Sequence, residues 1–407
     1  MTIDRVAFLS IHTSPLAAPG SGDAGGMNVY IDELARTMAV RGVSIDVFTR
    51  AAADMLRVID VIPGYRVIEI PTVAVDDGRG DERLADLVGD FADGVVKWSA
   101  NQGIRYDVVH SHYWLSGWAG VLIQDVVGVP LAISFHTLGR VKAVTRRDDE
   151  PPPSLMRIAA ETEVIARAGC VVASTPIEAG ELLEHYGASP ERLCVSPPGV
   201  DHDRFGPGDR RAARARLGIG PEPIILFAGR IQPLKALDVS LAAFEMLAHD
   251  LPSLRLVVVG GPSGPQGDAE ITRTQALARH MGVGDRLEIR GPLPHDDLSD
   301  AYRAANVLHV PSRSESFGLV AVEAQACGLP VVASRVGGLP YVVADDRSGL
   351  LVSGWDPADH AVALHRVLTE PETARRLGRG ALERSERFSW SATADRLLEL
   401  YSGIQRP

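Results

Sequence analysis

The chain has 407 residues, of which 45% are apolar, and its formal net charge is −11. This length exceeds one ordinary domain and allows two full cores, and the acidic balance excludes a nucleic-acid partner, since phosphate backbones are held by basic patches. No apolar run approaches the roughly 18 residues of a membrane span, so we expect a cytoplasmic enzyme without a membrane partner. The cysteines lack metal-binding spacing, so we expect no zinc site and no disulfide among Cys170, Cys194 and Cys327.

The first half of the chain alternates apolar runs with helical periodicity. Such short runs are typical of buried parallel strands in an α/β domain. We expect a Rossmann-like, doubly wound domain over residues 1–203. Its strands are predicted at 6–11, 43–48, 65–70, 107–110, 130–135, 170–174 and 194–196, and its helices through Val40, across 83–101, over 154–168 and between the last two strands.

A glycine-rich loop separates the first strand from the first helix. Its segment 20–25 matches the G-x-G-x-x-G pattern of dinucleotide-binding turns. In that fingerprint the first glycine ends the strand, whereas Gly20 lies nine positions after Ile11, which disfavours a dehydrogenase. We interpret the loop as a turn where the backbone approaches a ligand. The residues expected to line it are Asp23, Gly25, Gly26 and Asn28.

Two later strands of this half carry histidines. His110 and His112 alternate on one strand and share a face, but a metal site would need a third ligand, which is not evident. The next strand delivers His136 and Thr137 at its carboxyl end, where open parallel sheets bind ligands. The long charged loop that follows favours an active-site role for His136 over a structural one.

A break in the periodicity at 196–201 marks the domain junction. After a charged stretch with a short helix at Arg210–Leu217, strand-helix alternation restarts with strands at 223–228, 254–260, 287–290 and 307–310. This predicts a second Rossmann-like domain over residues 204–385, facing the first across a central cleft. The amphipathic segment 386–407 is expected to be a helix that packs back on the first domain.

In the second half of the chain, charged residues and a predicted helix N-terminus follow the strands. Arg230 and Lys235 lie in the loop before a helix at 236–248, where two cations suit a diphosphate. Ser316 is predicted to be the N-cap of a helix over 317–326. Such a helix start binds phosphate through its backbone N–H groups. These groups belong to Ser316, Phe317, Gly318 and Leu319.

Two acids, Glu315 and Glu323, form an E-x7-E pattern around this helix start. Glu323 lies among apolar residues, where a buried carboxylate is costly unless a cation or a hydroxyl-rich group pairs with it. A ribose would satisfy it, and so would a salt bridge to an arginine of a neighbouring element. The residues alone leave both interpretations open.

The segment P-S-R-S-E-S-F-G-L-V-A-V-E resembles the nucleotide-sugar site of retaining GT-B glycosyltransferases, the fold group of glycogen and sucrose synthases. Together with the blocks at 22–31, 110–117, 136–138 and 229–235, nearly the whole chain resembles one subfamily, the mycothiol-pathway D-inositol 3-phosphate glycosyltransferases of actinobacteria. The resemblance implies a retaining hexosyltransferase that needs no cofactor and no metal. It would transfer a sugar, N-acetylglucosamine from its UDP form in that subfamily, to a small polar acceptor such as D-inositol 3-phosphate. A homodimer is compatible with the sequence.

The resemblance and the reasoning from the residues together assign three groups of site residues. The catalytic group is His136, Arg230, Lys235 and Glu315. The group expected to bind the donor is His12, Gly25, Gly26, Ser316, Phe317, Gly318, Leu319 and Glu323. The group expected to bind the acceptor is Asp23, Asn28, Asp81, Tyr113, Thr137, Arg140 and Arg157.

Two departures from the subfamily concern the acceptor. Ungapped counting back from Tyr113 places Asp81 where the subfamily carries a lysine for the acceptor phosphate, and Arg140 stands where it has a small residue. One alternative is a secondary-metabolism paralogue that uses another UDP or GDP sugar and an amine or zwitterionic acceptor. In the other, Arg140 replaces the missing lysine and the acceptor phosphate is kept. A sugar-nucleotide 2-epimerase and a non-catalytic sensor are remoter alternatives.

Overall fold

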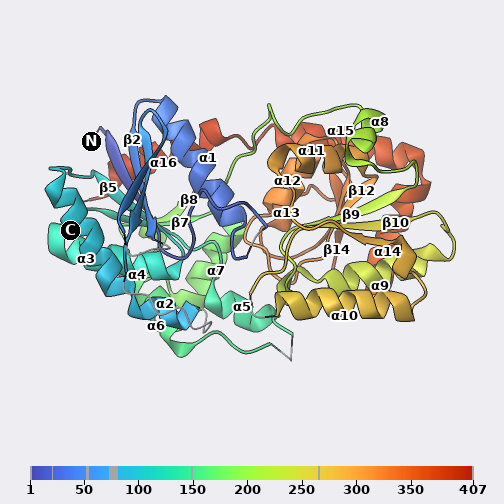
Figure 1. Ribbon diagram of the computed structural model, residues 1–407, viewed down its shortest axis with the longest axis horizontal. Coiled ribbons are helices and arrows are strands. Elements are labelled where there is room, and N and C mark those ends of the chain that lie inside the picture. The colour runs from blue at the N-terminus through green and yellow to red at the C-terminus, as the bar shows by residue number, and fades with distance from the viewer. Residues whose placement is uncertain are drawn as a thin grey trace.

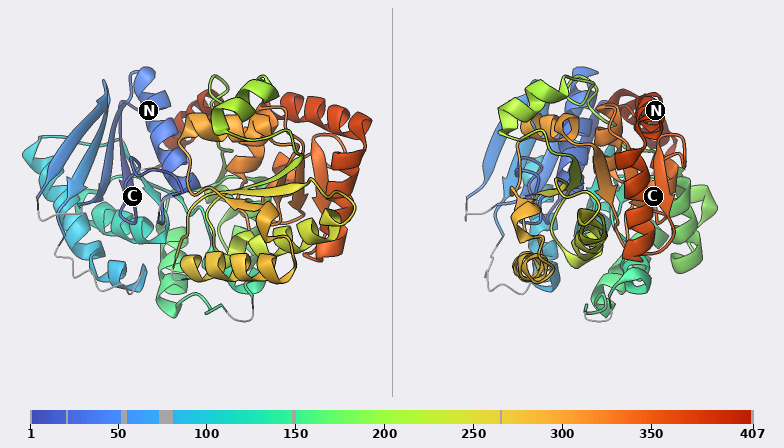
Figure 2. Two further views of the ribbon diagram at one scale, coloured as in Figure 1. Left: turned by 45° about the vertical axis from the view of Figure 1, so that its right-hand side comes forward. Right: turned by 90° about the vertical axis from the view of Figure 1, so that its right-hand side faces the viewer.

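The computed structural model describes residues 2–20, 22–51, 55–72, 81–147, 150–264 and 266–405, without the side chains of 81–83. These residues form two α/β lobes that lie side by side (Figure 1), one blue to green and one yellow to red. In Figure 2 the sheets of both lobes are seen between layers of helices. No helix within the described ranges reaches the length and apolarity of a membrane span.

The first lobe is built on an eight-stranded sheet in the order β3-β4-β2-β1-β5-β6-β7-β8. The β3–β4 pair is antiparallel, and the other neighbours pair in parallel. The strands are β1 (Arg5–Ser10), β2 (Ser44–Arg50), β3 (Arg57–Ile62), β4 (Tyr65–Ile70), β5 (Val108–His112), β6 (Leu131–Ser134), β7 (Cys170–Ala173) and β8 (Leu193–Val195). The helices are α1 (Gly26–Val40), α2 (Asp81–Asp86), α3 (Val88–Asn101), α4 (Trp114–Val127), α5 (Gly139–Thr145), α6 (Leu155–Arg167) and α7 (Pro176–Tyr186).

Successive residues of β1 divide between two cores, one on each face of the sheet. Ala7 and Leu9 belong to the core formed with α3, α4 and α6. Val6 and Phe8 belong to the core on the opposite face, formed with α1 and α16 (Trp390–Gly403). This alternation is the two-residue period of a strand buried on both faces.

The second lobe has a six-stranded parallel sheet in the order β11-β10-β9-β12-β13-β14. Its strands are β9 (Ile224–Ala228), β10 (Arg255–Val259), β11 (Leu287–Ile289), β12 (Val307–Val310), β13 (Val331–Ser334) and β14 (Gly349–Val352). Its helices are α8 (Arg210–Leu217), α9 (Leu237–Ala248), α10 (Gly267–His280), α11 (His295–Ala304), α12 (Leu319–Ala326), α13 (Leu339–Val342), α14 (Pro357–Thr369) and α15 (Pro371–Ser385). The predicted arrangement of two doubly wound parallel sheets is confirmed.

The C-terminal helix α16 returns to the first lobe, as expected from the sequence. Its buried residues Leu397 and Tyr401 join the core beside α1. The Trp390 ring lies 5.7 Å from that of Tyr30. The chain therefore crosses between the lobes twice, and both crossings lie along one side of the molecule (Figure 1).

Several local predictions differ from the structure. The region predicted as one helix over 83–101 is two helices, α2 and α3, which are divided at Leu87. Strand β3 was not predicted, because its residues are half-buried or exposed and lack an apolar run. Helix α5 occupies part of the segment predicted to be a loop.

The prediction of three reduced cysteines is wrong for two of them. Cys170 and Cys194 form a disulfide, with their Cα atoms 6.0 Å apart, and Cys327 is free. Strands β7 and β8 are neighbours in the sheet, with Val172 opposite Cys194. Strand order decides which cysteines meet, and the spacing along the chain does not reveal it.

An ion pair joins the lobes on the side away from the two crossings, between the residue that follows α5 and the first turn of α10 (Figure 1). Arg147, which follows α5, places Nη2 2.7 Å from Oε1 of Glu270 in the first turn of α10. The side chains are only 12% and 8% exposed. The pair therefore links the two lobes by a mostly buried contact.

We expect Arg147→Ala to open the cleft and to lower kcat/KM at least about tenfold. Without Arg147 the buried Glu270 keeps only the more distant Arg273, whose Nη1 lies 3.7 Å from Oε1, so the closed arrangement loses its cross-lobe ion pair. Small-angle X-ray scattering should show a larger radius of gyration for the variant. Arg335→Ala, which breaks an exposed pair with Asp345, is the matched control. An unchanged radius together with unchanged kinetics would refute the role of this ion pair.

Candidate active site

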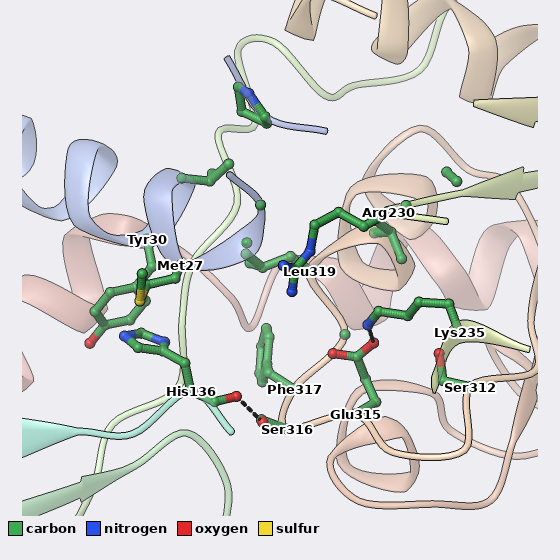
Figure 3. A pocket seen from close by; sticks show the side chains of 18 of the residues that line it. Met27, Tyr30, His136, Arg230, Lys235, Ser312, Glu315, Ser316, Phe317 and Leu319 are labelled. Atoms are coloured by element: carbon green, nitrogen blue, oxygen red, sulfur yellow. Dashed lines mark hydrogen bonds and ion pairs between the residues drawn. The ribbon is translucent and has the colours of Figure 1, made fainter. Parts of the chain in front are cut away.

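A cavity of about 240 Å³ lies between the lobes, at the carboxyl ends of strands from both sheets (Figure 3). The first lobe contributes the glycine loop before α1 and the residues after β6. The second lobe contributes the loops after β9 and β12. The catalytic residues predicted from the sequence all line it: His136, Arg230, Lys235 and Glu315.

Lys235 and Glu315 form an ion pair inside the cavity, with Nζ 2.5 Å from Oε2. Lys235 ends a short 3-10 turn, and the following Ala236 adopts a left-handed conformation with φ 55°. Both charged side chains are mostly buried, so neither is an ordinary surface charge. The pair holds an ammonium group in a mostly buried position, where its interaction with an anion is stronger than at the surface.

Arg230 reaches from the second lobe to the glycine loop of the first. Its Nη1 lies 3.3 Å from both the backbone oxygen of Asp23 and Oγ of Ser263. A Cβ atom on Gly25 would stand 2.8 Å from Nε of Arg230. A glycine at position 25 therefore allows this close approach, as expected for a loop that meets a ligand or a partner chain segment.

Glu323 is buried on α12 and accepts a hydrogen bond of 2.8 Å from the Tyr302 hydroxyl. Burial raises the pKa of Glu323 to about 7, although the Tyr302 bond and the charge of Arg204 oppose this shift. No sequence motif marked Tyr302 on α11 as a partner. Glu323 also lines the cavity, so its carboxylate remains a candidate for binding a hydroxyl-rich group.

The prediction that Ser316 caps a helix starting at Phe317 is wrong. Helix α12 begins at Leu319, and its N-cap is Gly318 in a left-handed conformation with φ 102°. The Ser316 hydroxyl instead donates to the backbone carbonyl of His136 across the cleft. In addition, Oγ of Ser174 donates to the backbone oxygen of Ser316 over 3.1 Å. A contact with the other lobe therefore replaces the local cap, while residues 316–319 still line the cavity.

Three of the residues predicted to bind the acceptor meet in one cluster beside the cavity. Arg157 donates from Nη2 to Oγ1 of Thr137 at 3.1 Å and from Nη1 to the hydroxyl of Tyr113 at 3.2 Å. The guanidinium also lies over the Tyr113 ring. Glu161 accepts from Nε of Arg157 at 2.8 Å, so the buried cation has a fixed orientation.

Other residues predicted for the acceptor do not join this cluster. Asn28 is buried, and its amide accepts from the backbone of Gly25 and donates to Thr13 and Ser14. Arg140 donates to the carbonyl of His185 and lies over the Tyr186 ring, 5.0 Å from its centroid. The Arg140 guanidinium therefore has partners of its own and does not join the contacts of Arg157 with Tyr113 and Thr137.

Two of the residues predicted to bind the acceptor are acidic, Asp23 and Asp81, and the structure describes the side chain of the first. Asp23 lies at the lobe interface, where its Oδ1 accepts from Ser263 at 3.2 Å and its Oδ2 lies 3.9 Å from Nε2 of His12. Ser263 lies in the loop between β10 and α10, and no sequence pattern marked this serine. The side chain of Asp81 lies outside the described residues.

Solved structures share this arrangement over almost the full chain. Sucrose-phosphate synthase from Thermosynechococcus elongatus is 32% identical, with a TM-score of 0.87 and coverage of 98% of both chains. WaaG, described as a glycosyltransferase of lipopolysaccharide biosynthesis, is 20% identical with a TM-score of 0.73, and supports the fold alone. Two facing Rossmann-like lobes with cations and an E-x7-E segment at the cleft define a glycosyltransferase of the GT-B class.

Sequence comparison identifies the family more closely. The descriptions that match are "Glycosyl transferase 4-like domain" over residues 25–199 and "Glycosyl transferases group 1" over residues 209–384. A D-inositol 3-phosphate glycosyltransferase 2 of Catenulispora acidiphila is 48% identical, covering 98% of this chain and 94% of its own length. A D-inositol 3-phosphate glycosyltransferase of Nocardiopsis dassonvillei is also 48% identical, with coverage of 99% and 95%. The chain therefore belongs to the glycosyltransferase family of these relatives.

Proposed function

We propose that this glycosyltransferase moves N-acetylglucosamine from its UDP form to D-inositol 3-phosphate with retention of anomeric configuration. The observation that carries the proposal is the placement of Arg230 and the Lys235–Glu315 pair in one enclosed cleft. The names of the relatives support the acceptor. The donor sugar and the retention follow from the family resemblance of the E-x7-E segment.

The proposed mechanism stabilises the leaving diphosphate. Negative charge grows on this group as the bond to the sugar breaks, and Lys235 and Arg230 hold fixed positive charge beside it. Glu315 orients Lys235 and binds the transferred sugar, while Glu323 binds the ribose. The departing phosphate takes the proton of the acceptor hydroxyl, and closure of the lobes excludes water that would hydrolyse the donor.

The acceptor phosphate is assigned to the cluster of Arg157, Tyr113 and Thr137. Arg157 supplies a buried guanidinium, which suits a phosphate, and the two hydroxyl groups add donors at fixed positions. Arg140 is held by His185 and Tyr186, which disfavours the idea that it replaces the missing lysine.

Mass spectrometry of products from a panel of donors and acceptors tests this assignment. The panel pairs UDP-N-acetylglucosamine, UDP-glucose and GDP-mannose with D-inositol 3-phosphate, free inositol and an aminocyclitol. The proposal expects one dominant product, with the mass of N-acetylglucosaminyl inositol phosphate and the anomeric configuration of the donor by NMR. Transfer to an amine acceptor alone would reject it, and donor turnover without an acceptor would indicate an epimerase or a hydrolase.

We expect Asp81→Lys to lower the KM for D-inositol 3-phosphate by about tenfold or more. By ungapped counting back from Tyr113, the subfamily carries a lysine for the acceptor phosphate at this position, and exchanging a repelling for an attracting charge beside a phosphate is worth about 1–4 kcal/mol. Steady-state kinetics with D-inositol 3-phosphate and with free inositol checks this prediction. The KM for the phosphorylated acceptor should fall, whereas the KM for free inositol should not change. Equal change for both acceptors would place Asp81 away from the phosphate. Wild-type preference for a cationic acceptor would instead favour the zwitterion alternative.

A further inference from the structure

Three histidines from neighbouring strands form a buried line that ends in the active site. His110 and His112 lie on β5 and are fully buried, and His136 follows β6. Nδ1 of His112 lies 3.1 Å from Nε2 of His136. The rings of His110 and His112 lie 4.4 Å apart, so the line is continuous. The metal-site interpretation of His110 and His112 left His136 out, although the fold places it next to them.

The three rings are neutral at physiological pH. Burial lowers the pKa of His110 and of His136 to about 3, and it lowers the pKa of His112 well below its ordinary value. A neutral imidazole has one N–H group and one bare nitrogen. Each hydrogen bond in the line therefore has a direction that is set by the tautomers.

The surroundings of His112 select its tautomer. Within the described residues, its buried Nε2 has no hydrogen-bond partner. A proton on Nε2 would be an orphaned buried donor, which is rare in native structures because its desolvation is not repaid. A proton on Nδ1 is instead used in the bond to His136. His112 therefore donates, and Nε2 of His136 accepts.

We propose that His112 is a positioning residue, whose Nδ1–H bond to Nε2 of His136 fixes His136 as the tautomer with its N–H on Nδ1. This N–H is then directed to a hydroxyl or carbonyl oxygen of the sugar bound in the cavity. The inference rests on the proposed transfer reaction, since a sugar must occupy the site beside His136.

The backbone of His136 shows why such a restraint is needed. His136 has φ 60°, a left-handed conformation that is unfavourable for a side chain other than glycine. The bond from Ser316 holds its carbonyl, and the bond from His112 holds its ring. The Tyr30 ring, 5.2 Å away at 71°, packs against the imidazole. Both ends of one strained residue are thus fixed by named partners.

The first test reads the tautomer without substrate. Protein labelled with ¹⁵N-histidine, with His136 assigned by comparison with His136→Gln, should show a protonated Nδ1 and a bare Nε2 for this residue. In His112→Phe, which keeps a ring but removes the bond, the two His136 nitrogens should change toward a mixture of tautomers. A proton on Nε2 of His136 in the wild-type protein would overturn the proposal. This readout stands even if the proposed transfer activity fails.

The second test reads catalysis. His112→Phe should lower kcat about tenfold with a smaller change in the donor KM, because one hydrogen bond contributes about 0.5–1.5 kcal/mol. His112→Asn, whose amide N–H takes the place of Nδ1–H, should recover kcat to within about threefold of the wild type. Equal loss in the two variants, both folded by circular dichroism, would reduce His112 to a packing residue and overturn the proposal.

Tyr401→Phe provides the matched control for the line. It removes the hydroxyl that lies 2.5 Å from Nδ1 of His110, and it leaves the His112–His136 bond in place. The control should keep the His136 tautomer and a kcat within about twofold of the wild type. A changed His136 tautomer in this variant would show that His112 alone does not set it.

Discussion

Lys235→Ala is expected to lower kcat by about 10²- to 10³-fold, with a smaller change in the donor KM. This is the usual cost of removing one preorganised group that stabilises charge developing in a transition state. The Lys235 ammonium lies in the enclosed cleft, paired with Glu315 at 2.5 Å, so water cannot readily replace it. Steady-state kinetics with a saturating acceptor measures both constants.

Two further variants test whether the loss of kcat comes from the loss of positive charge at the diphosphate. Lys235→Arg keeps the charge and should recover part of kcat, whereas Arg230→Ala should lose at least about tenfold, because Arg230 also contacts Asp23 and Ser263. If kcat were unchanged in both alanine variants, the diphosphate would have to lie elsewhere. A loss confined to KM would move their effect to ground-state binding.

The two glutamates of the E-x7-E segment should separate into two roles. Glu323→Gln is expected to weaken binding of free UDP by about 10- to 10²-fold, since hydrogen bonds to a charged group contribute about 1.5–3 kcal/mol. Glu315→Gln should lower kcat at least about tenfold and leave UDP affinity within about threefold, because free UDP lacks the sugar. Calorimetric titration and kinetics measure the two effects. Equal weakening of UDP binding by both variants would show that the division of roles is wrong.

The affinity for UDP should also depend on pH through Glu323. Its pKa lies at about 7 in the unliganded protein because of burial, and ribose hydroxyls donate to the ionised form. Affinity should therefore rise as pH increases through 7 and fall toward pH 6, where the carboxyl group is protonated. Since the diphosphate also titrates near this range, the measure is the wild type relative to Glu323→Gln at each pH. A ratio that stays constant from pH 6 to pH 8 would contradict the ribose assignment.

The sequence predicted the features that depend on local pattern. Buried strands such as β1 and β12 are short apolar runs, and the polar residues that follow them fall at the cleft because parallel strands end on one side. Lys235, Glu315 and His136 could therefore be placed in one site from the sequence. The cluster around Arg157 was found through the resemblance, since no local pattern shows that it meets Tyr113.

Features that depend on tertiary contacts were missed. Ser316 has the right chemistry for an N-cap, yet a carbonyl of the other lobe takes its hydroxyl. Tyr302 meets Glu323 only because α11 packs on α12, and Cys170 meets Cys194 only because β7 and β8 are adjacent. Strand β3 was missed for a different reason. It lies at the edge of the sheet and is half-exposed, so it has no apolar run that would predict it.

The return of α16 to the first lobe has a consequence for how the chain folds during synthesis. Domains of a nascent chain generally fold in order from the N-terminus. Here the core beside α1 lacks Leu397 and Tyr401 until the ribosome has made the whole second lobe. Until α16 has been synthesised, the apolar face of α1 that it covers therefore stays exposed. A nascent chain that stalls before residue 390 exposes this face to chaperones or to aggregation.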